Sequence, residues 1–168
     1  RTEAAEQAAQ HDPLTGLLNR RGWMQQCASR LPVDQPSVVA LFDMDYFKAI
    51  NDTWGHGVGD AVLIAVGRHL QCNLDNRDVI GRYGGEEFMV LMPSISVAIA
   101  ERRLNEVRQA LVDNPVEPSE LGHALHVTAS VGFACLPQGG TSGSLGTVLE
   151  EADAALYQRS EERRVGKE

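Results

Sequence analysis

Two adjacent carboxylates, Glu86 and Glu87, lie between a glycine pair, Gly84-Gly85, and an apolar run, 88–92. Paired glycines between two β-rich segments favour a tight β-hairpin turn, which explains the glycines. It does not explain the acids, because carboxylates at the mouth of an apolar strand are costly to bury unless a cation or ligand pairs them. A further acid, Asp43, directly follows another apolar run. Asp43 and Glu86 together offer the hard oxygen ligands that Mg²⁺ prefers.

The order of the surrounding elements predicts how these two acids could meet. We expect strands over 37–42 and 78–83, joined through two helices, so that they run parallel with space for one strand between them. If the return strand of the hairpin, 88–92, fills this space, it runs antiparallel to the first strand. Its beginning, Glu86, then lies beside the end of the first strand, Asp43. The topology therefore predicts a cation site at one edge of the sheet.

Hydrophobic periodicity and the positions of glycine and proline predict the remaining elements. Residues 1–10 are rich in alanine and glutamate, and we expect them to end a helix that connects an upstream domain to the domain over 11–168. Asp12 and Asp60 are expected to be helix N-caps. The order of elements predicts an α+β, ferredoxin-like palm fold, with helices flanking a mainly antiparallel sheet. A turn and helix are expected over 12–31, further helices over 47–53, 60–74, 96–114 and 145–159, and a last strand over 126–136.

Composition and charge narrow the class of partner. The 168 residues are 43% hydrophobic and 23% charged, which is ordinary for a single soluble globular domain. The formal net charge of −8 argues against a nucleic-acid polymer, which calls for a basic face. It does not exclude a nucleotide, whose few phosphates metal ions and one or two lysines can neutralise. No apolar run is long enough to cross a bilayer, and we expect no membrane contact by this segment. Separately, we expect a cytoplasmic location, with the parent protein either free or attached to the inner membrane.

Four segments resemble, in order, the motifs of the GGDEF family of diguanylate cyclases, here with a GGEEF hairpin. They are 12–20 (DPLTGLLNR), 42–60 (FDMDYFKAINDTWGHGVGD), 82–88 (RYGGEEF) and 152–157 (ADAALY). The resemblance implies a palm-type nucleotide cyclase fold and the condensation of two GTP molecules to cyclic di-GMP with release of two pyrophosphates. It also implies metal-assisted attack of a 3′-hydroxyl on an α-phosphate across a homodimer, Mg²⁺ or Mn²⁺ as cofactor, and an upstream sensor domain in the full-length chain.

The resemblance assigns the metal ligands to Asp43, the backbone carbonyl of Met44, Glu86 and Glu87. It also makes Glu86 a candidate proton acceptor for the attacking hydroxyl. These two roles compete, because a carboxylate bound to a metal is a poor base, and we favour the ligand role. Glu87 either completes a second metal site or is only a charge at the hairpin edge. An EF-hand is excluded, although the acids at 43 and 45 begin like one, because Lys48 stands where its turn needs glycine.

The resemblance also implies a set of substrate contacts. Lys48 would neutralise phosphate charge and stabilise the transition state, and the amides at the start of the short helix near Phe47 would bind phosphate. Asn51 and Asp60 would read guanine, because its N1–H and N2–H₂ are neighbouring donors that one carboxylate can accept. Adenine lacks that donor at N1, and the mismatch would cost about 1–3 kcal/mol. Two further contacts are implied at His56 and Arg164.

The sequence departs from the family pattern at two places. The family's product-inhibition site reads Arg-x-x-Asp; here Asp78 matches, but Asp75 replaces the arginine, and a carboxylate there would repel the phosphates of the product. We therefore predict weak or absent feedback. The family usually carries a lysine where this chain has Ser160, which removes one phosphate contact and would weaken GTP binding.

Two alternatives to an active diguanylate cyclase stay open. One is a catalytically idle GGDEF-like domain that binds GTP or a partner and signals by its conformation; Ser160 favours it mildly, and the intact motif residues argue against it. The other is a cyclase of mixed or adenine-containing dinucleotides, against which Asp60 speaks.

Overall fold

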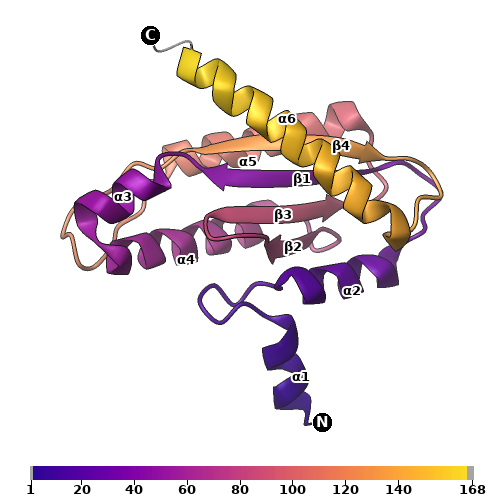
Figure 1. Cartoon of the computed structure of the whole chain (residues 1–168), viewed down its shortest axis with the longest axis horizontal. Helices are drawn as coiled ribbons and strands as arrows, with labels where there is room; N and C mark the ends of the chain where they lie inside the picture. Colours follow the sequence, from indigo (N-terminus) through magenta and orange to yellow (C-terminus); the bar gives the residue numbers. More distant parts are fainter. Residues whose placement is uncertain (1, 166–168) are drawn as a thin grey trace.

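A four-stranded antiparallel sheet forms the centre of the chain in a computed structural model that describes the backbone of residues 2–165 and the side chains of residues 2–161. The strands lie in the order β2-β3-β1-β4 (Figure 1). Their bounds are β1 Ser37–Met44, β2 Val79–Arg82, β3 Glu87–Met92 and β4 Ala129–Leu136. β3 is antiparallel to both β1 and β2, so β1 and β2 are parallel with β3 between them. The predicted fold class and strand arrangement are confirmed.

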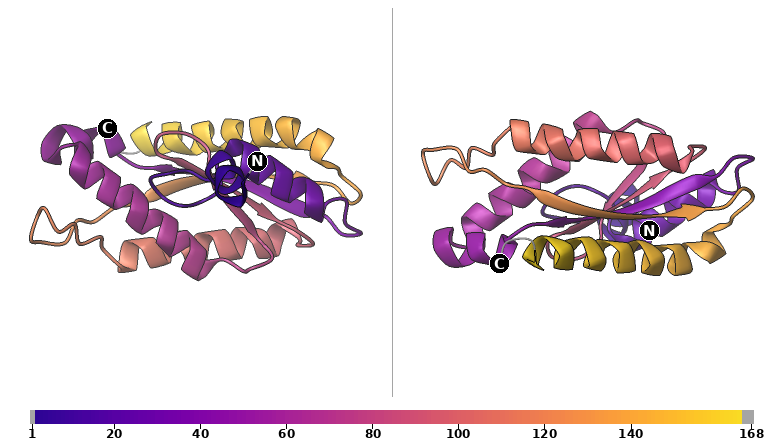
Figure 2. Two further views of the ribbon diagram at one scale, coloured as in Figure 1. Left: turned by 90° about the horizontal axis from the view of Figure 1, so that it is seen from below. Right: turned by 90° about the horizontal axis from the view of Figure 1, so that it is seen from above.

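The two faces of the sheet are covered by different helices, as Figure 2 shows. Alternate residues of β1 serve the two layers: Val38, Ala40 and Phe42 belong to one buried cluster, Val39 and Leu41 to the other. The first cluster contains residues of α4 (His56–Asn73) and α5 (Val97–Asp113), and the second contains residues of α2 (Arg20–Arg30) and α6 (Leu145–Val165). Burial on both faces explains why β1 is apolar without alternation.

A glycine in β4 lets α6 lie close to the sheet. A β-carbon at Gly132 would overlap the backbone of α6 at Ala152 and Leu156, so only glycine fits at this position. The close approach lets the ADAALY segment pack over the sheet near the ends of β1 and β3. A 3₁₀ turn, η1 (Ser142–Ser144), leads into α6.

The expected helix start at Asp12 is wrong. Helix α2 begins at Arg20, and its N-cap is Asn19, whose Oδ1 accepts from Gly22 N at 2.8 Å. Asp12 instead closes a turn by accepting from the amide and hydroxyl of Thr15 at 2.8 and 2.7 Å. The Asp-Pro pair thus stabilises a turn rather than a helix.

The expected start of α4 at Asp60 is also wrong. The break after α3 (Phe47–Trp54) is confined to Gly55, with φ of +91°, and α4 already begins at His56. Gly57 and Gly59 lie inside α4, and Asp60 therefore lies within the helix and does not cap it. Gly59 packs closely on Asn51 and Phe47 of α3, and this contact offsets the low helix propensity of glycine there.

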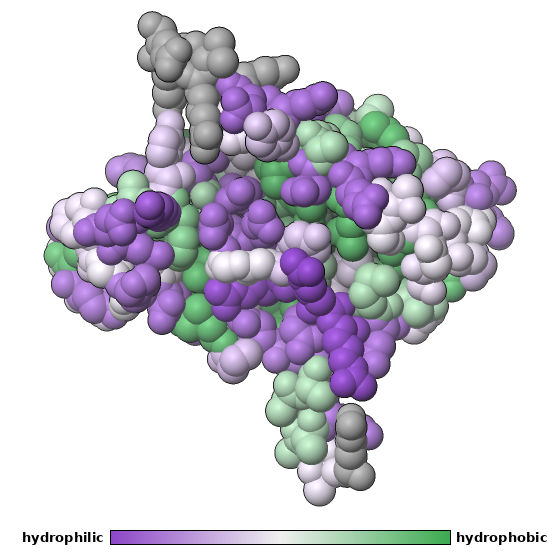
Figure 3. Space-filling model, in the orientation of Figure 1, coloured by the Kyte–Doolittle hydropathy of each residue, from purple (hydrophilic) through white to green (hydrophobic). Residues whose placement is uncertain are grey.

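The N-terminal helix α1 (Glu3–Gln10) has no buried residue and projects from the body of the domain (Figures 1 and 3). Its last two carbonyls are bound by one residue: Asn19 Nδ2 donates to Ala9 O at 3.0 Å, and Asn19 N donates to Gln10 O at 2.9 Å. Asn19 therefore holds the end of α1 on the beginning of α2. Between residues 2 and 165, no helix is long and apolar enough to cross a membrane.

Candidate active site

The two acids predicted to meet do meet at one end of the sheet. In the β1–β3 ladder Asp43 stands opposite Glu87, and Met44 N donates to Glu86 O at 3.1 Å. Asp43 and Glu86 both line one cleft of about 290 Å³. Residues more than forty positions apart in sequence are thus brought together by the antiparallel pairing of β1 with β3.

The same cleft is lined by residues of four other segments. Lys48 and Phe47 come from the first turn of α3, Thr128 and Ser130 from β4 and the residues before it, and Leu156 and Ser160 from α6. The remaining lining residues are Met44, which ends β1, and Asp45 and Tyr46, in the turn between β1 and α3.

The turn between β1 and α3 is strained in a way that suits an anion. Tyr46 has a left-handed backbone conformation, with φ of 56° and ψ of 29°, and serves as N-cap of α3 without a capping bond from its side chain. Strained residues of this kind gather at functional sites. The first turn of α3, which lines the cleft with Phe47 and Lys48, therefore has no side-chain cap, and free amides at a helix start are able to bind an anion.

The charge in the cleft favours a cation. The pKa of Asp43 is raised to about 7. Burial is the largest cause, followed by repulsion from the neighbouring carboxylates of Glu86, Glu87, Asp45 and Asp153. The pKa of Glu87 is also raised, first by burial and then by the carboxylates of Asp153 and Glu86. The guanidinium of Arg20 partly offsets this increase. A bound divalent cation would relieve this repulsion.

The donor set fits Mg²⁺ completed by substrate. Among the residues that the structure describes, no three His, Cys, Asp or Glu side chains are grouped as a metal site of their own. Mg²⁺ is usually held by one or two carboxylates together with phosphate oxygens and water, so the pair Asp43 and Glu86 is sufficient.

The predicted guanine readers lie apart from the acids. Asn51 is on α3, and the exposed His56 and Asp60 are in the first turns of α4; none of them lines the acidic cleft. Asn51 and Asp60 belong to two helices that pack against each other. The side chain of Arg164 lies outside the described residues, although its backbone is part of α6.

Two residues near the hairpin were missed from the sequence. Arg20 Nε donates to Tyr83 O at 2.7 Å, and its guanidinium lies 3.9 Å from the centre of the Tyr83 ring. Asp153 of α6 lies close enough to Asp43 and Glu87 to raise the pKa of each. The arginine closing the segment 12–20 and the acid of the segment 152–157 were the available indications.

Comparison with known proteins decides the family. The sequence model described as "Diguanylate cyclase, GGDEF domain" matches residues 9–165. This chain belongs to the GGDEF family. The diguanylate cyclase DgcP of Pseudomonas aeruginosa is 38% identical over 159 residues, which are 92% of this chain and 23% of DgcP. The chain thus spans about a quarter of the length of that relative.

Solved structures of GGDEF proteins have the same fold. The diguanylate cyclase SiaD of Pseudomonas aeruginosa, solved with its activator SiaC, aligns with a TM-score of 0.81 at 37% identity over 95% of this chain and 61% of SiaD. The coiled coil and GGDEF domain of DgcB from Caulobacter crescentus, solved with c-di-GMP, aligns with a TM-score of 0.81 at 30% identity over 95% of this chain and 84% of that one.

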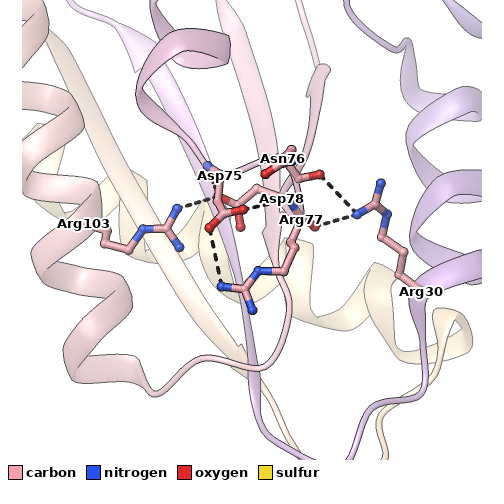
Figure 4. Close-up of polar contacts among 6 residues, drawn as sticks. All are labelled: Arg30, Asp75, Asn76, Arg77, Asp78 and Arg103. Atoms are coloured by element: carbon pink, nitrogen blue, oxygen red, sulfur yellow. Dashed lines mark hydrogen bonds and ion pairs between the residues drawn. The ribbon is translucent and has the colours of Figure 1, made fainter.

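The segment that replaces the family's product-inhibition motif is internally paired in this GGDEF domain (Figure 4). Arg77 pairs with Asp75 at 3.4 Å, and Arg103 of α5 pairs with the buried Asp78 at 2.6 Å. Arg30 of α2 approaches from the opposite side and donates to Arg77 O at 2.8 Å. Both carboxylates are therefore already partnered by arginines of the same chain.

Proposed function

We propose that this GGDEF domain is a diguanylate cyclase that condenses two GTP molecules to cyclic di-GMP and two pyrophosphates. The observation that carries the proposal is the convergence of Asp43 and Glu86 on one cleft that also holds Lys48. The comparisons support the reaction class, because named diguanylate cyclases are among the relatives.

Asp43 and Glu86 would hold a Mg²⁺ or Mn²⁺ ion, with the Met44 carbonyl and Glu87 as further ligands. When bound, this ion neutralises the triphosphate and polarises the α-phosphorus. Lys48, exposed at the start of α3, would donate to phosphate oxygens as charge accumulates on the leaving pyrophosphate. Glu86 would also be a candidate acceptor for the proton of the attacking 3′-hydroxyl, although we assign it chiefly to the metal.

The base would be read at the junction of α3 and α4. Asp60 accepts from N1–H and N2–H₂ of guanine, Asn51 binds the same base edge, and His56 contributes a further contact. Phe47 supports the phosphate-binding turn from the core side, where it packs against buried residues. Arg164 would reach the phosphates from the last turns of α6.

Each domain would hold one GTP, so the ring closes only when two copies face each other across a two-fold axis. We further propose that residues 1–10 end a connecting helix, that 11–168 form the catalytic domain, and that an upstream sensor domain of the parent protein controls pairing. The parent protein would work in the cytoplasm or at the inner membrane, with no nucleic-acid polymer as partner.

The competing proposal is an idle GTP-binding domain. To separate the two, the chain is incubated with GTP and Mg²⁺ over a range of protein concentrations, and cyclic di-GMP and pyrophosphate are measured. We expect both products, at a specific rate that rises with concentration and that Lys48→Ala abolishes. GTP binding without product in a dimer would favour the idle domain, and equal use of ATP would favour a mixed-dinucleotide cyclase.

A further inference from the structure

Asp45 is the third carboxylate in the cleft, and the proposed reaction does not use it. Its two oxygens are bound by two hydroxyls from across the sheet: Thr128 Oγ1 donates to Oδ2 at 2.6 Å, and Ser130 Oγ donates to Oδ1 at 2.7 Å. Asp45 N also donates to Thr128 O at 2.9 Å. Short O–H···O⁻ bonds of this length are charge-assisted and stronger than neutral ones.

These bonds hold one end of the phosphate-binding turn. Asp45 is the residue between the end of β1, at Met44, and the left-handed Tyr46 that begins α3. The pairing of Asp43 with Ser130 and of Met44 with Ala129 ends the β1–β4 ladder just before it. Without the two side-chain bonds, only the backbone bond from Asp45 N to Thr128 O would tie this residue to the β4 side of the sheet. A residue in a left-handed conformation persists only where its surroundings enforce it.

We propose that Asp45, Thr128 and Ser130 form a positioning clamp that fixes the turn 44–48 for the triphosphate, and that Asp45 is not a ligand of the metal. This inference rests on the proposed function, since the turn is the part of the site that would meet the phosphates. A carboxylate with both oxygens engaged by hydroxyls fixes geometry. Asp43, in contrast, stands opposite Glu87 in the β1–β3 ladder and lines the cleft with Glu86.

The alternative, in which Asp45 ligates the cation, makes an opposite prediction for the hydroxyl variants. Thr128→Val with Ser130→Ala removes the clamp but leaves the carboxylate. A ligand role therefore predicts that the Mg²⁺ concentration giving half-maximal binding is unchanged or lower in this double variant. A positioning role predicts that this double variant behaves as Asp45→Ala does. In both, affinity for the triphosphate falls while the Mg²⁺ concentration that gives half-maximal binding stays constant.

The experiment measures binding of 3′-deoxy-GTP, which lacks the attacking hydroxyl, by calorimetry at saturating Mg²⁺ and across a Mg²⁺ series. We expect the dissociation constant to rise on the order of tenfold in Asp45→Ala and in the double hydroxyl variant, and to rise no further when the changes are combined. Thr128→Ser, which keeps a hydroxyl at the same position, should restore most of the affinity lost in Thr128→Val.

Circular dichroism and thermal unfolding of each variant show whether the fold is kept, and the Thr128→Val and Thr128→Ser pair replaces the double variant if that one unfolds. An unchanged dissociation constant in the folded variants would overturn the clamp. So would a half-maximal Mg²⁺ concentration that rises in Asp45→Ala but not in the hydroxyl variants. If the unsubstituted chain fails to bind 3′-deoxy-GTP, the proposed function falls and the clamp falls with it.

Discussion

Gly59 in α4 lies directly against the side-chain amide of Asn51 in α3, so that a β-carbon added at Gly59 would overlap it. The ring of Phe47 lies 3.3 Å from the same position. Gly59→Ala should therefore displace a proposed guanine contact, and we expect the dissociation constant for GTP to rise about tenfold. Calorimetric titration of the variant with GTP at saturating Mg²⁺ measures this dissociation constant.

The control for this variant is Gly146→Ala, near the start of α6, where nothing lies within 4 Å of the added methyl group. Alanine is favoured over glycine in a helix by roughly 1 kcal/mol, so this control should unfold at a slightly higher temperature and bind GTP normally. GTP affinity that is equal in Gly59→Ala and Gly146→Ala would show that Gly59 does not position Asn51.

Asp43→Asn should separate activity from stability. Burial and four neighbouring acids raise the pKa of Asp43 to about 7, so its charge is unfavourable in the metal-free chain. At pH 8 and without Mg²⁺, the neutral asparagine side chain should therefore raise the unfolding temperature. In the presence of Mg²⁺ and GTP, the same variant should show no turnover. Adding Mg²⁺ with GTP should stabilise the unsubstituted chain and leave the variant unchanged. Turnover retained in Asp43→Asn combined with Glu86→Gln would contradict the metal site.

Ser160→Lys should strengthen the binding of GTP. Ser160 lines the cleft in the place where the family usually has a lysine, and its hydroxyl brings no charge to the phosphates. We expect KM for GTP to fall about threefold to tenfold in the variant, because an ammonium adds one charge-assisted contact. Ser160→Met is the matched control, since it adds length without charge, and an equal effect in both variants would rule out the phosphate contact.

Added cyclic di-GMP should inhibit turnover weakly. The carboxylate of Asp75 occupies the position of the family's arginine, and Asp78 is engaged by Arg103 at 2.6 Å. Initial rates at fixed GTP and rising cyclic di-GMP should show only the inhibition expected of a product at the active site. Strong non-competitive inhibition that Arg77→Ala removes would prove this prediction wrong.

The ion pair between Asp12 and Arg82, at 3.1 Å, should make stability depend on pH in acid. Burial acts to raise the pKa of Asp12, but hydrogen bonds from Thr15 and the guanidinium of Arg82 outweigh it and lower the pKa. A lowered pKa in the folded state means stability that is present above the ordinary value of 3.8 and is lost as the pH falls through the folded value. Thermal unfolding from pH 6 to pH 2 should show a smaller loss in Asp12→Asn than in the unsubstituted chain.

The sheet and the meeting of Asp43 with Glu86 could be predicted from the sequence, because apolar runs and one crossover leave few ways to pair the strands. The start of α4 could not, since it depends on tertiary packing, as the contact of Gly59 with Asn51 and Phe47 of α3 shows. The clamp on Asp45 was also hidden: its hydroxyl partners lie 83 and 85 residues away, and a threonine and a serine near a strand carry no pattern of their own.

Two consecutive residues connect the N-terminal helix to the hairpin. The side chain and backbone of Asn19 donate to Ala9 O and Gln10 O at the end of α1, and Arg20 donates to Tyr83 O. Tyr83 is followed directly by Gly84-Gly85 and the two acids. A change in the orientation of α1 would therefore act first on Asn19 and Arg20, and through Arg20 on the residue that precedes the GGEEF turn.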